Sequence, residues 1–155
     1  MSQVNGSKSD TMWPKALERS ATKQVIERLF AAADDSTREG STIFSECFTL
    51  TGELIARGHV CKGHQEIFKF RDGAWDTITF RKHEIRKVYI SDHDDKDVIM
   101  LGHVTFGHKN GQKTSTDYVG NFAFADTEQG PRIEKYQAWL DSKPLADLMA
   151  TGDKA

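Results

Sequence analysis

The chain has 155 residues, of which 37% are hydrophobic and 28% charged, a composition typical of a folded globular domain. Its formal net charge of −2, with charges of both signs dispersed, argues against a nucleic-acid-binding surface. No apolar run approaches the roughly 18 residues of a membrane-spanning helix, and the N-terminus has no hydrophobic signal segment. We therefore expect a cytoplasmic protein without nucleic-acid or membrane partners, with one domain over residues 13–150 and a disordered N-terminus over residues 1–12.

The sequence gives no indication of a metal or a cofactor. Cys47 and Cys61 make neither a disulfide framework nor a zinc motif, so both are expected to be reduced and at least partly buried. His103 and His108 are five residues apart on a predicted strand, so they project from opposite faces and cannot chelate one ion. Nucleotide-binding glycine motifs are also missing.

Three helices are predicted in the first half of the chain. Apolar residues recur along one face of residues 14–34, which favours an amphipathic helix. Ser41 is expected to cap a second, short helix. A short strand or hairpin over residues 48–58 separates it from a third helix over residues 64–77.

The second half of the chain predicts long strands joined by turns. Asn110-Gly111 is a strong hairpin signal between two of them. The strands are expected over residues 82–90, 97–108, 114–125 and 132–141, with one more helical turn at residues 145–149. Long antiparallel strands curl, so the helices can cover the concave side of a bent sheet. We predict an α+β fold shaped as a cone, whose interior is filled by side chains or holds a ligand.

Four motifs in this order resemble the NTF2-like superfamily, in particular its SnoaL-like branch. The motifs are the polar turn at residues 34–40 with Ile43-Phe44 after it, the entry to the third helix at residues 62–67, the strand pair 83–90 and 97–100, and the final strand 133–139. The resemblance implies a curved antiparallel sheet with three N-terminal helices forming the cone.

The resemblance extends to fungal natural-product enzymes of this fold. The segments 22–29, 81–89 and 136–139 are similar to cofactor-free isomerases of the brevianamide-type semipinacolase kind and to meroterpenoid isomerases. Such enzymes typically form homodimers through the outer face of the sheet. In the SnoaL-like cyclases a catalytic Asp follows a His by two residues, and here that pair looks like Tyr136 and Ala138. The acid is missing, so cyclisation by that residue is not implied.

Two alternative sets of side chains could face the interior from one strand. Asp117 and Asn121 are four residues apart and share a face, where they could serve as base and hydrogen-bond donor. Tyr118 and Phe122 take the opposite face and look like core or cavity wall, where the Tyr118 hydroxyl could donate to a substrate oxygen. The sequence leaves open which face points inward.

Further candidates come from the other segments. Glu134, Tyr136 and Ala138 are predicted to share the pocket-facing side of the last strand, with Glu134 as an acid or base. Arg38 follows the first helix, near the open end of the cone in this fold, where a guanidinium could polarise a carbonyl. His83 opens a strand and could be a pocket base.

The first functional hypothesis is a cofactor-independent isomerase or cyclase, performing a semipinacolase-like rearrangement. Its substrate would be a hydrophobic small molecule with a bulky, apolar skeleton, an intermediate of indole-alkaloid or terpenoid secondary metabolism. Catalysis is assigned to Arg38, Asp117, Tyr118 and Glu134, and substrate binding to Trp75, His83, Met100, Asn121, Phe122 and Tyr136. The alternatives are a dehydratase or epoxide hydrolase of the same fold, and a non-catalytic module that binds an apolar ligand or dimerises.

Overall fold

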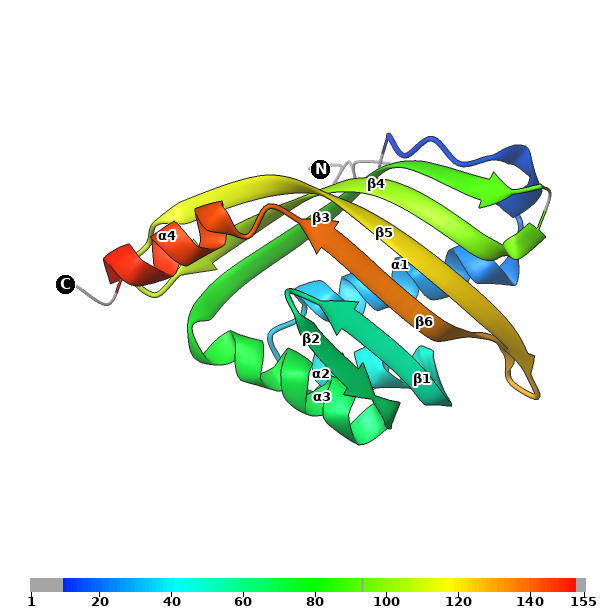
Figure 1. Cartoon of the computed structure of the whole chain (residues 1–155), viewed down its shortest axis with the longest axis horizontal. Helices are drawn as coiled ribbons and strands as arrows, with labels where there is room; N and C mark the ends of the chain where they lie inside the picture. Colours follow the sequence, from blue (N-terminus) through cyan, green and yellow to red (C-terminus); the bar gives the residue numbers. More distant parts are fainter. Residues whose placement is uncertain (1–9, 93, 153–155) are drawn as a thin grey trace, which may run out of the picture.

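The computed structural model describes residues 10–92 and 94–152, which fold into a bent sheet with helices on its concave side (Figure 1). The helices are α1 (Ala21–Asp34), α2 (Arg38–Glu46), α3 (Gly63–Gly73) and α4 (Lys143–Gly152), with short 3-10 turns η1 (Lys15–Leu17) and η2 (Ala74–Asp76). The strands are β1 (Phe48–Ala56), β2 (His59–Lys62), β3 (Ile78–Ser91), β4 (Asp94–His108), β5 (Lys113–Thr127) and β6 (Gly130–Leu140). The predicted α+β fold and its order of elements are confirmed.

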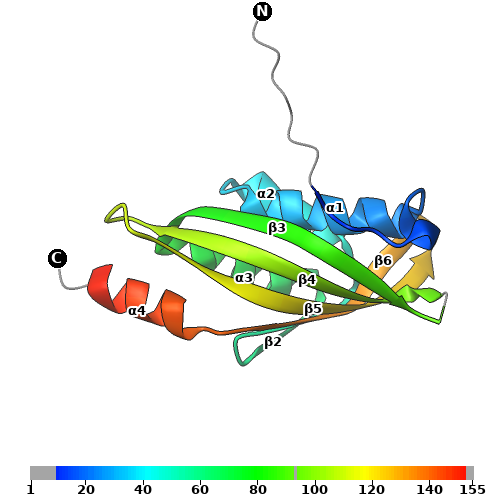
Figure 2. The same ribbon diagram turned by 90° about the horizontal axis from the view of Figure 1, so that it is seen from above.

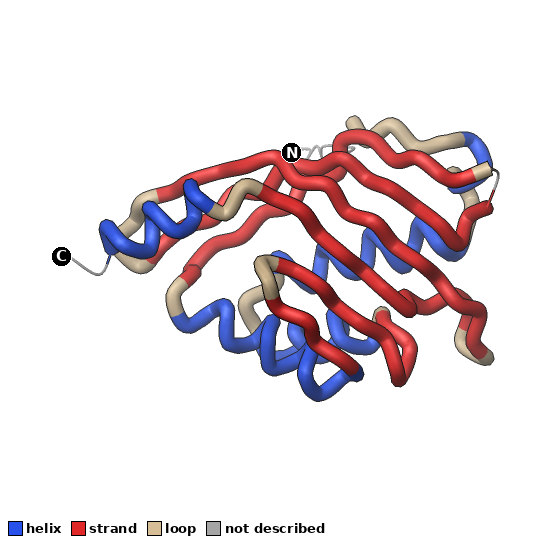
Figure 3. The backbone as a smooth tube through the Cα atoms, viewed as in Figure 1, coloured by secondary structure: helices blue, strands red, loops and turns tan. Residues whose placement is uncertain are grey.

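The sheet has the strand order β2-β1-β6-β5-β4-β3 within the described residues (Figure 3). Neighbouring strands are antiparallel except β1 and β6, which run parallel. The predicted antiparallel pairing therefore holds for every neighbouring pair of described strands except β1 and β6, which makes the sheet mixed. No tight turn joins β1 to β6, so no hairpin constrains the direction in which they pair.

The length of the central strands explains the shape of the molecule. β3, β4 and β5 have 14, 15 and 15 residues, and strands this long twist and coil instead of staying flat. Register shifts in β3 and β6 add local bends. Figure 2, a view from above, shows β4 and β5 passing over α3.

The concave face of the sheet is filled mainly by α1. Its buried face includes Val25, Ile26, Leu29 and Phe30, and the helix contacts β3 and β6. Burial of one such side chain contributes roughly 1.5–3 kcal/mol, so this face accounts for much of the stability of the cone. Cys47 and Cys61 are both buried free thiols, as the sequence predicts.

The helix boundaries differ from the prediction because of local capping. Pro14 precedes the short turn η1, and α1 begins only after Ser20, whose hydroxyl accepts a hydrogen bond from the Thr22 N–H. Similarly, Thr37 caps α2 through the Gly40 N–H, four residues before the predicted cap at Ser41.

The N-terminal segment joins the edge of the sheet. Met12 forms a parallel bridge to Lys87 of β3, and its backbone exchanges hydrogen bonds with Arg86 and Val88 at 3.0 Å. The predicted disorder over residues 1–12 is therefore wrong at Met12, and residues 1–9 lie outside the described part of the chain. Among the described helices, none has the length and apolar character needed to cross a membrane.

Candidate active site

A mostly enclosed cavity of about 70 Å³ lies between the helices and the inner face of the sheet. It is lined by side chains from α1, α2, α3 and strands β1, β3, β4, β5 and β6, including Phe30, Phe44, Arg71, Arg81, His83, Tyr118 and Tyr136. Its volume suffices for several water molecules and is below the roughly 300–1,000 Å³ of typical ligand pockets. Its wall is mainly aromatic and aliphatic, with a few polar groups.

Asp34 and His83 form a hydrogen-bonded pair at one wall of this cavity. Asp34 is the last residue of α1, and His83 lies on the inner face of β3. The Asp34 Oδ1 lies 2.6 Å from the His83 Nδ1, and the Asp34 Oδ2 accepts the His83 backbone N–H at 2.9 Å. Two hydrogen bonds to one carboxylate fix both the backbone and the ring of His83.

The His83 ring is held neutral. Burial lowers its pKa to about 4, and this effect outweighs the opposing influence of the Asp34 carboxylate. The neighbouring guanidinium groups of Arg71 and Arg81 lower the pKa further. A neutral ring that donates from Nδ1 to Asp34 leaves the lone pair on Nε2, which has no hydrogen-bond partner among the described residues.

Tyr118 supplies an uncommitted hydroxyl to the same cavity. Its side chain is buried, its ring packs edge-on against His83 at 5.6 Å, and its hydroxyl has no hydrogen-bond partner among the described residues. Burial raises the pKa of Tyr118 well above its usual value, so the hydroxyl keeps its proton and can donate it in a hydrogen bond.

Two arginines lie beside this pair, Arg81 buried and Arg71 half-buried. Arg81, on β3, is 5% exposed, and its guanidinium makes one hydrogen bond, from Nη1 to the Ala33 carbonyl at 3.4 Å. Arg71, in the last turn of α3, lies over the Phe44 ring at 4.5 Å. Burial lowers the pKa of Arg71 to about 10, which leaves it protonated near neutral pH. The described residues provide neither arginine with an ion pair.

Aromatic rings hold these polar groups in place. Trp75 lies over the Arg81 guanidinium at 5.0 Å. Phe122 stacks on Tyr136 with ring centroids 4.3 Å apart, and Met100 is fully buried behind them. Of the predicted binding residues, His83 and Tyr136 line the cavity, whereas Trp75, Met100 and Phe122 support its wall.

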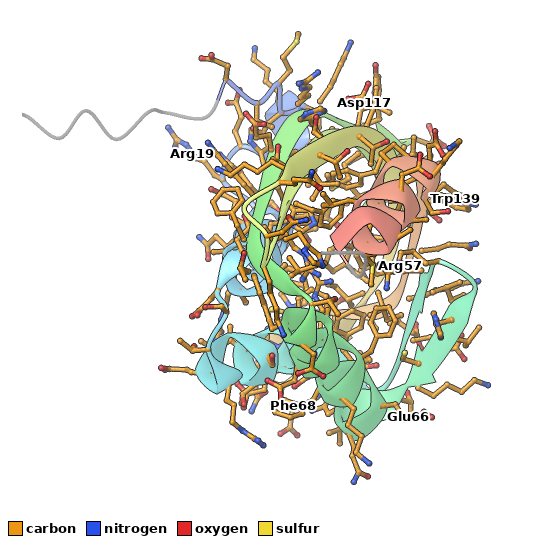
Figure 4. The ribbon with its side chains drawn as sticks, turned by 90° about the vertical axis from the view of Figure 1, so that its left-hand side faces the viewer. Arg19, Arg57, Glu66, Phe68, Asp117 and Trp139 are labelled. Atoms are coloured by element: carbon orange, nitrogen blue, oxygen red, sulfur yellow. The ribbon has the colours of Figure 1, made fainter. Side chains whose placement is uncertain are left out.

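Three predicted site residues lie outside the cavity. Asp117 is exposed on the outer face of β5, where its carboxylate lies 2.8 Å from the His103 ring (Figure 4). Asn121 shares that face and donates to the Asp97 carboxylate and the Val98 carbonyl. Arg38 begins α2, is exposed, and lies 5.2 Å from the Phe68 ring. The Tyr118 face of β5 is therefore the inner one, and the placement of the other three in the pocket is wrong.

A β-bulge removes Glu134 from the inner face of β6. Ile133 pairs with Phe124, whereas Lys135 pairs with Ala123, so Glu134 is the extra residue. The bulge breaks the alternation, and Glu134 is exposed while Ile133 and Tyr136 are both buried. The expectation that Glu134 faces the pocket is wrong for this reason.

Sequence reasoning missed three of the charged residues at the site, although each has a spacing signal. Asp34 lies four residues after Phe30, on the inner side of α1, and Arg71 lies four residues after the buried Ile67. Arg81 precedes His83 by two residues and therefore shares its strand face. Because charged side chains normally lie at the surface, this spacing alone was not enough to predict their positions. In the part of the chain that the structure describes, no three His, Cys, Asp or Glu side chains are grouped as metal ligands.

The fold is shared with solved structures of low sequence identity. A protein from Jannaschia sp. CCS1 described as a SnoaL-like polyketide cyclase is 15% identical and has a TM-score of 0.67 over 89% of this chain and 98% of its own. TerC, co-crystallised with polyporic acid, is 15% identical, with a TM-score of 0.68 over 84% of this chain and 99% of its own. An NTF2-like protein of unknown function from Burkholderia pseudomallei K96243 is also 15% identical, with a TM-score of 0.68 over 84% and 98% of the two chains.

These similarities establish an NTF2-like, SnoaL-like fold for the chain. No family model and no curated protein matches the sequence.

Proposed function

We propose that the protein is a cofactor-independent isomerase or cyclase that works by acid–base catalysis in the cone. The observation that carries this proposal is the neutral His83, held by Asp34, beside the unpartnered hydroxyl of Tyr118 in one cavity. An unsatisfied buried hydroxyl costs about 1–3 kcal/mol, so its retention favours a role toward a ligand. Two convergent polar groups in an apolar pocket also favour an enzyme over a plain interaction module.

The geometry supports proton transfer next to a carbonyl group. The His83 Nε2 takes a proton from the carbon beside the carbonyl, and the C–H electron pair moves to give an enolate. The Tyr118 hydroxyl donates a hydrogen bond to the enolate oxygen, and Asp34 stabilises the imidazolium that forms. His83 then returns the proton to a different carbon, or the enolate carbon attacks an electrophile within the same substrate.

The electrostatics of the site explain why such a weak base could work. A ring whose pKa is about 4 takes a carbon-bound proton only when the developing negative charge is strongly stabilised. The guanidinium groups of Arg71 and Arg81 lie close enough to His83 to lower its pKa. They provide this stabilisation in a low-dielectric interior, where charge interactions are strong.

The comparisons support this class of reaction through the fold alone, since one structural neighbour is described as a polyketide cyclase. We extend the proposal to a semipinacolase-like rearrangement of an indole-alkaloid or terpenoid intermediate on the strength of the sequence resemblance. A bulky intermediate of that kind requires the cavity to widen from about 70 Å³. Trp75 and Phe70, which are only partly buried, are the side chains best placed to move.

Deuterium exchange tests the proposal without knowledge of the substrate. Acetone or cyclohexanone is incubated with the protein in D₂O, and loss of the α-proton signal is followed by NMR. We expect exchange faster than with the same concentration of free imidazole, and about 10²-fold slower in His83→Gln and in Tyr118→Phe. If wild-type protein exchanges no faster than His83→Gln, the acid–base proposal is rejected.

A dehydratase or epoxide hydrolase would use the same residues differently, with His83 activating a water or accepting a proton beside a leaving hydroxyl. A non-catalytic module that binds an apolar ligand would instead leave the Tyr118 hydroxyl and the arginines unused. Exchange of ketone protons that depends on both His83 and Tyr118 separates the enzyme from this module.

We also propose that two copies of the chain associate through the outer face of the sheet. This face exposes a group of large apolar side chains, namely Tyr89, Ile99, Leu101, Val119 and Trp139. Strand pairing makes the group continuous, because Tyr89 is opposite Ile99, and Val119 is opposite both Leu101 and Trp139.

Charges of both signs border this outer apolar patch. Arg86, Lys87, Asp117 and Asp141 line a groove over the patch, and the Arg86 guanidinium lies 3.9 Å from the Asp117 carboxylate. A two-fold axis through the patch would place the apolar side chains of one copy on those of the other, which makes a second copy the best-matched occupant. Figure 4 shows Asp117 and Trp139 on the outer surface.

Sedimentation velocity tests this association. Trp139→Lys is expected to convert a dimer into a monomer, because it places a charge in the patch. Leu50→Lys is the matched control, since Leu50 is 82% exposed on β1, outside the patch, and its substitution should leave the dimer intact. A monomeric wild type at micromolar concentration, or a dimer that Trp139→Lys does not alter, rejects the proposal.

A further inference from the structure

The charges that line the cavity are unbalanced. Among the described residues, its lining contains Arg57, Arg71 and Arg81, but no Asp or Glu. Asp34 raises the pKa of both Arg71 and Arg81, but its carboxylate is already engaged by His83. The guanidinium groups of the buried Arg81 and the half-buried Arg71 therefore face the cavity without an ion pair to any described residue.

The hydrogen bonding of these two arginines is also incomplete. The Nε atoms of both Arg71 and Arg81 are buried and have no hydrogen-bond partner among the described residues. Arg81 uses only Nη1, in a long bond to Ala33, although a guanidinium has five donors. Rings of Phe44, Trp75 and Phe106 lie against the guanidinium groups and provide no carboxylate or carbonyl acceptor for the Nε–H donors.

A transient enolate does not account for this arrangement by itself. A charge that exists only during the reaction leaves both cations uncompensated in every other state, and burial of an unpaired charge is costly. A ligand that carries a permanent negative charge would compensate them whenever it is bound. The fork geometry of the guanidinium suits a carboxylate, which accepts two parallel hydrogen bonds.

We infer that the ligand of this cavity is an organic anion, whose carboxylate is bound by Arg71 and Arg81 and reached past Arg57. The assignment deepens the proposed function, on which it rests, by naming the substrate class as an enolisable carboxylate. The cavity of about 70 Å³ holds the carboxylate end of the molecule, and the rest of a bulky substrate requires the widening described above. Arg57 is exposed in the turn after β1 and adds a positive charge where the cavity meets solvent.

Anion binding would also prepare the base. Arg71 and Arg81 both lower the pKa of His83, and Asp34 raises it. A carboxylate that neutralises the two arginines weakens their effect on the pKa of His83. The pKa of His83 therefore rises, and His83 becomes a stronger base when the substrate is bound. Tyr118 also faces His83, and its raised pKa keeps its hydroxyl protonated. Glu27, Lys82, Glu84 and Arg86 line a second, more open pocket on which His83 also lies.

The test is a titration of the full chain with acetate, and with acetamide as its neutral analogue, in chloride-free buffer. NMR signals of the arginine Nε–H groups and of the His83 ring are followed. We expect saturable shifts of the Arg71 and Arg81 signals with acetate, at least about tenfold weaker binding of acetamide, and an upward shift of the His83 titration.

Variants show whether acetate binds in the cavity or elsewhere on the surface. Arg81→Lys keeps the positive charge but loses the planar pair of donors of the guanidinium group, and we expect it to weaken acetate binding about tenfold or more. Arg57→Gln, at an exposed position, should weaken binding less and carries little risk for folding. Arg38→Met is the control outside the cavity and should bind acetate as the wild type does.

Three results of the acetate titration would overturn the inference: NMR shifts spread over surface lysines, equal binding of acetamide, or shifts that do not saturate. His83→Gln should still bind acetate, because the base is not part of the anion site. Acetate binding without ketone deuterium exchange would reject the proposed function but support the anion site. Exchange without acetate binding would support the proposed function but reject the anion site.

Discussion

The ring of Tyr118 lies directly over Gly102, its cross-strand neighbour on β4. A Cβ atom at residue 102 would lie 2.5 Å from the Tyr118 Cζ and 2.7 Å from its hydroxyl oxygen. Residue 102 must therefore lack a side chain if the hydroxyl is to reach the cavity. This close approach links a glycine with no chemistry of its own to the proposed hydrogen-bond donor.

Gly102→Ala is expected to displace Tyr118 and to destabilise the protein by about 1–3 kcal/mol, as overpacked cores do. The free energy of unfolding is measured by urea denaturation. Gly73→Ala is the matched control, because Gly73 has φ −64° and a Cβ there would meet no atom within 4 Å. That control should be neutral or stabilising by up to about 1 kcal/mol. Equal effects of the two substitutions would contradict the packing argument.

Tyr118→Phe separates stability from function. Removing an unpartnered buried hydroxyl should leave the free energy of unfolding unchanged or raise it by about 1 kcal/mol. The same substitution should slow ketone deuterium exchange about 10²-fold, because the enolate oxygen loses its donor. A clear loss of stability would show that the hydroxyl has a structural partner, and would remove the main support for its role.

The stability of the fold should depend on pH through His83. Its pKa is about 4 in the folded protein and near 6.5 when unfolded, so between these values the unfolded chain binds a proton that the folded chain does not. This contribution is fully present above pH 6.5 and is lost as the pH falls to 4, by about 3 kcal/mol. His83→Gln should lack this component, as denaturation at pH 7 and pH 4.5 would reveal. An unchanged pH dependence in the variant would contradict a neutral, buried His83.

The residues on the outer surface should be dispensable for chemistry. Asp117→Asn and Glu134→Gln are expected to exchange ketone protons at the wild-type rate, because both carboxylates are exposed and neither lines the cavity. Each should change the free energy of unfolding by at most about 0.5 kcal/mol. A tenfold loss of exchange in either variant would place it in the mechanism and would require a different cavity.

The sequence was sufficient for the fold but only partly for the site. Hydrophobic periodicity located the long strands, since a strand buried on one face must alternate, and it placed His83, Tyr118 and Tyr136 on segments that turn out to line the cavity. The inward face of β5 is the face on which α1 packs. Strand periodicity shows which residues share a face, but it does not show which face a helix covers. Glu134 was misplaced because a one-residue bulge inverts the alternation and leaves no signal in the sequence itself.

The charged residues around the cavity were the hardest to foresee. Arg71, Arg81 and Asp34 occupy positions whose spacing marks them as internal, yet charged residues are rarely buried without a partner. The rule that charged side chains lie at the surface is sound for structural residues. Its failure at three positions around one cavity is what is expected where a site has been kept for a ligand at the expense of stability.

The bridge between Met12 and β3 affects how the molecule behaves at high concentration. The sheet ends in β2, which has only 4 residues, and in β3, which has 14. A long unpaired edge is a template for strand addition by another chain and hence for aggregation. Because Met12 already uses the Arg86 carbonyl and the Val88 N–H, part of the long edge is closed to a visiting strand. Truncation before residue 13 would therefore reopen that edge and lower the solubility of the protein without touching its cavity.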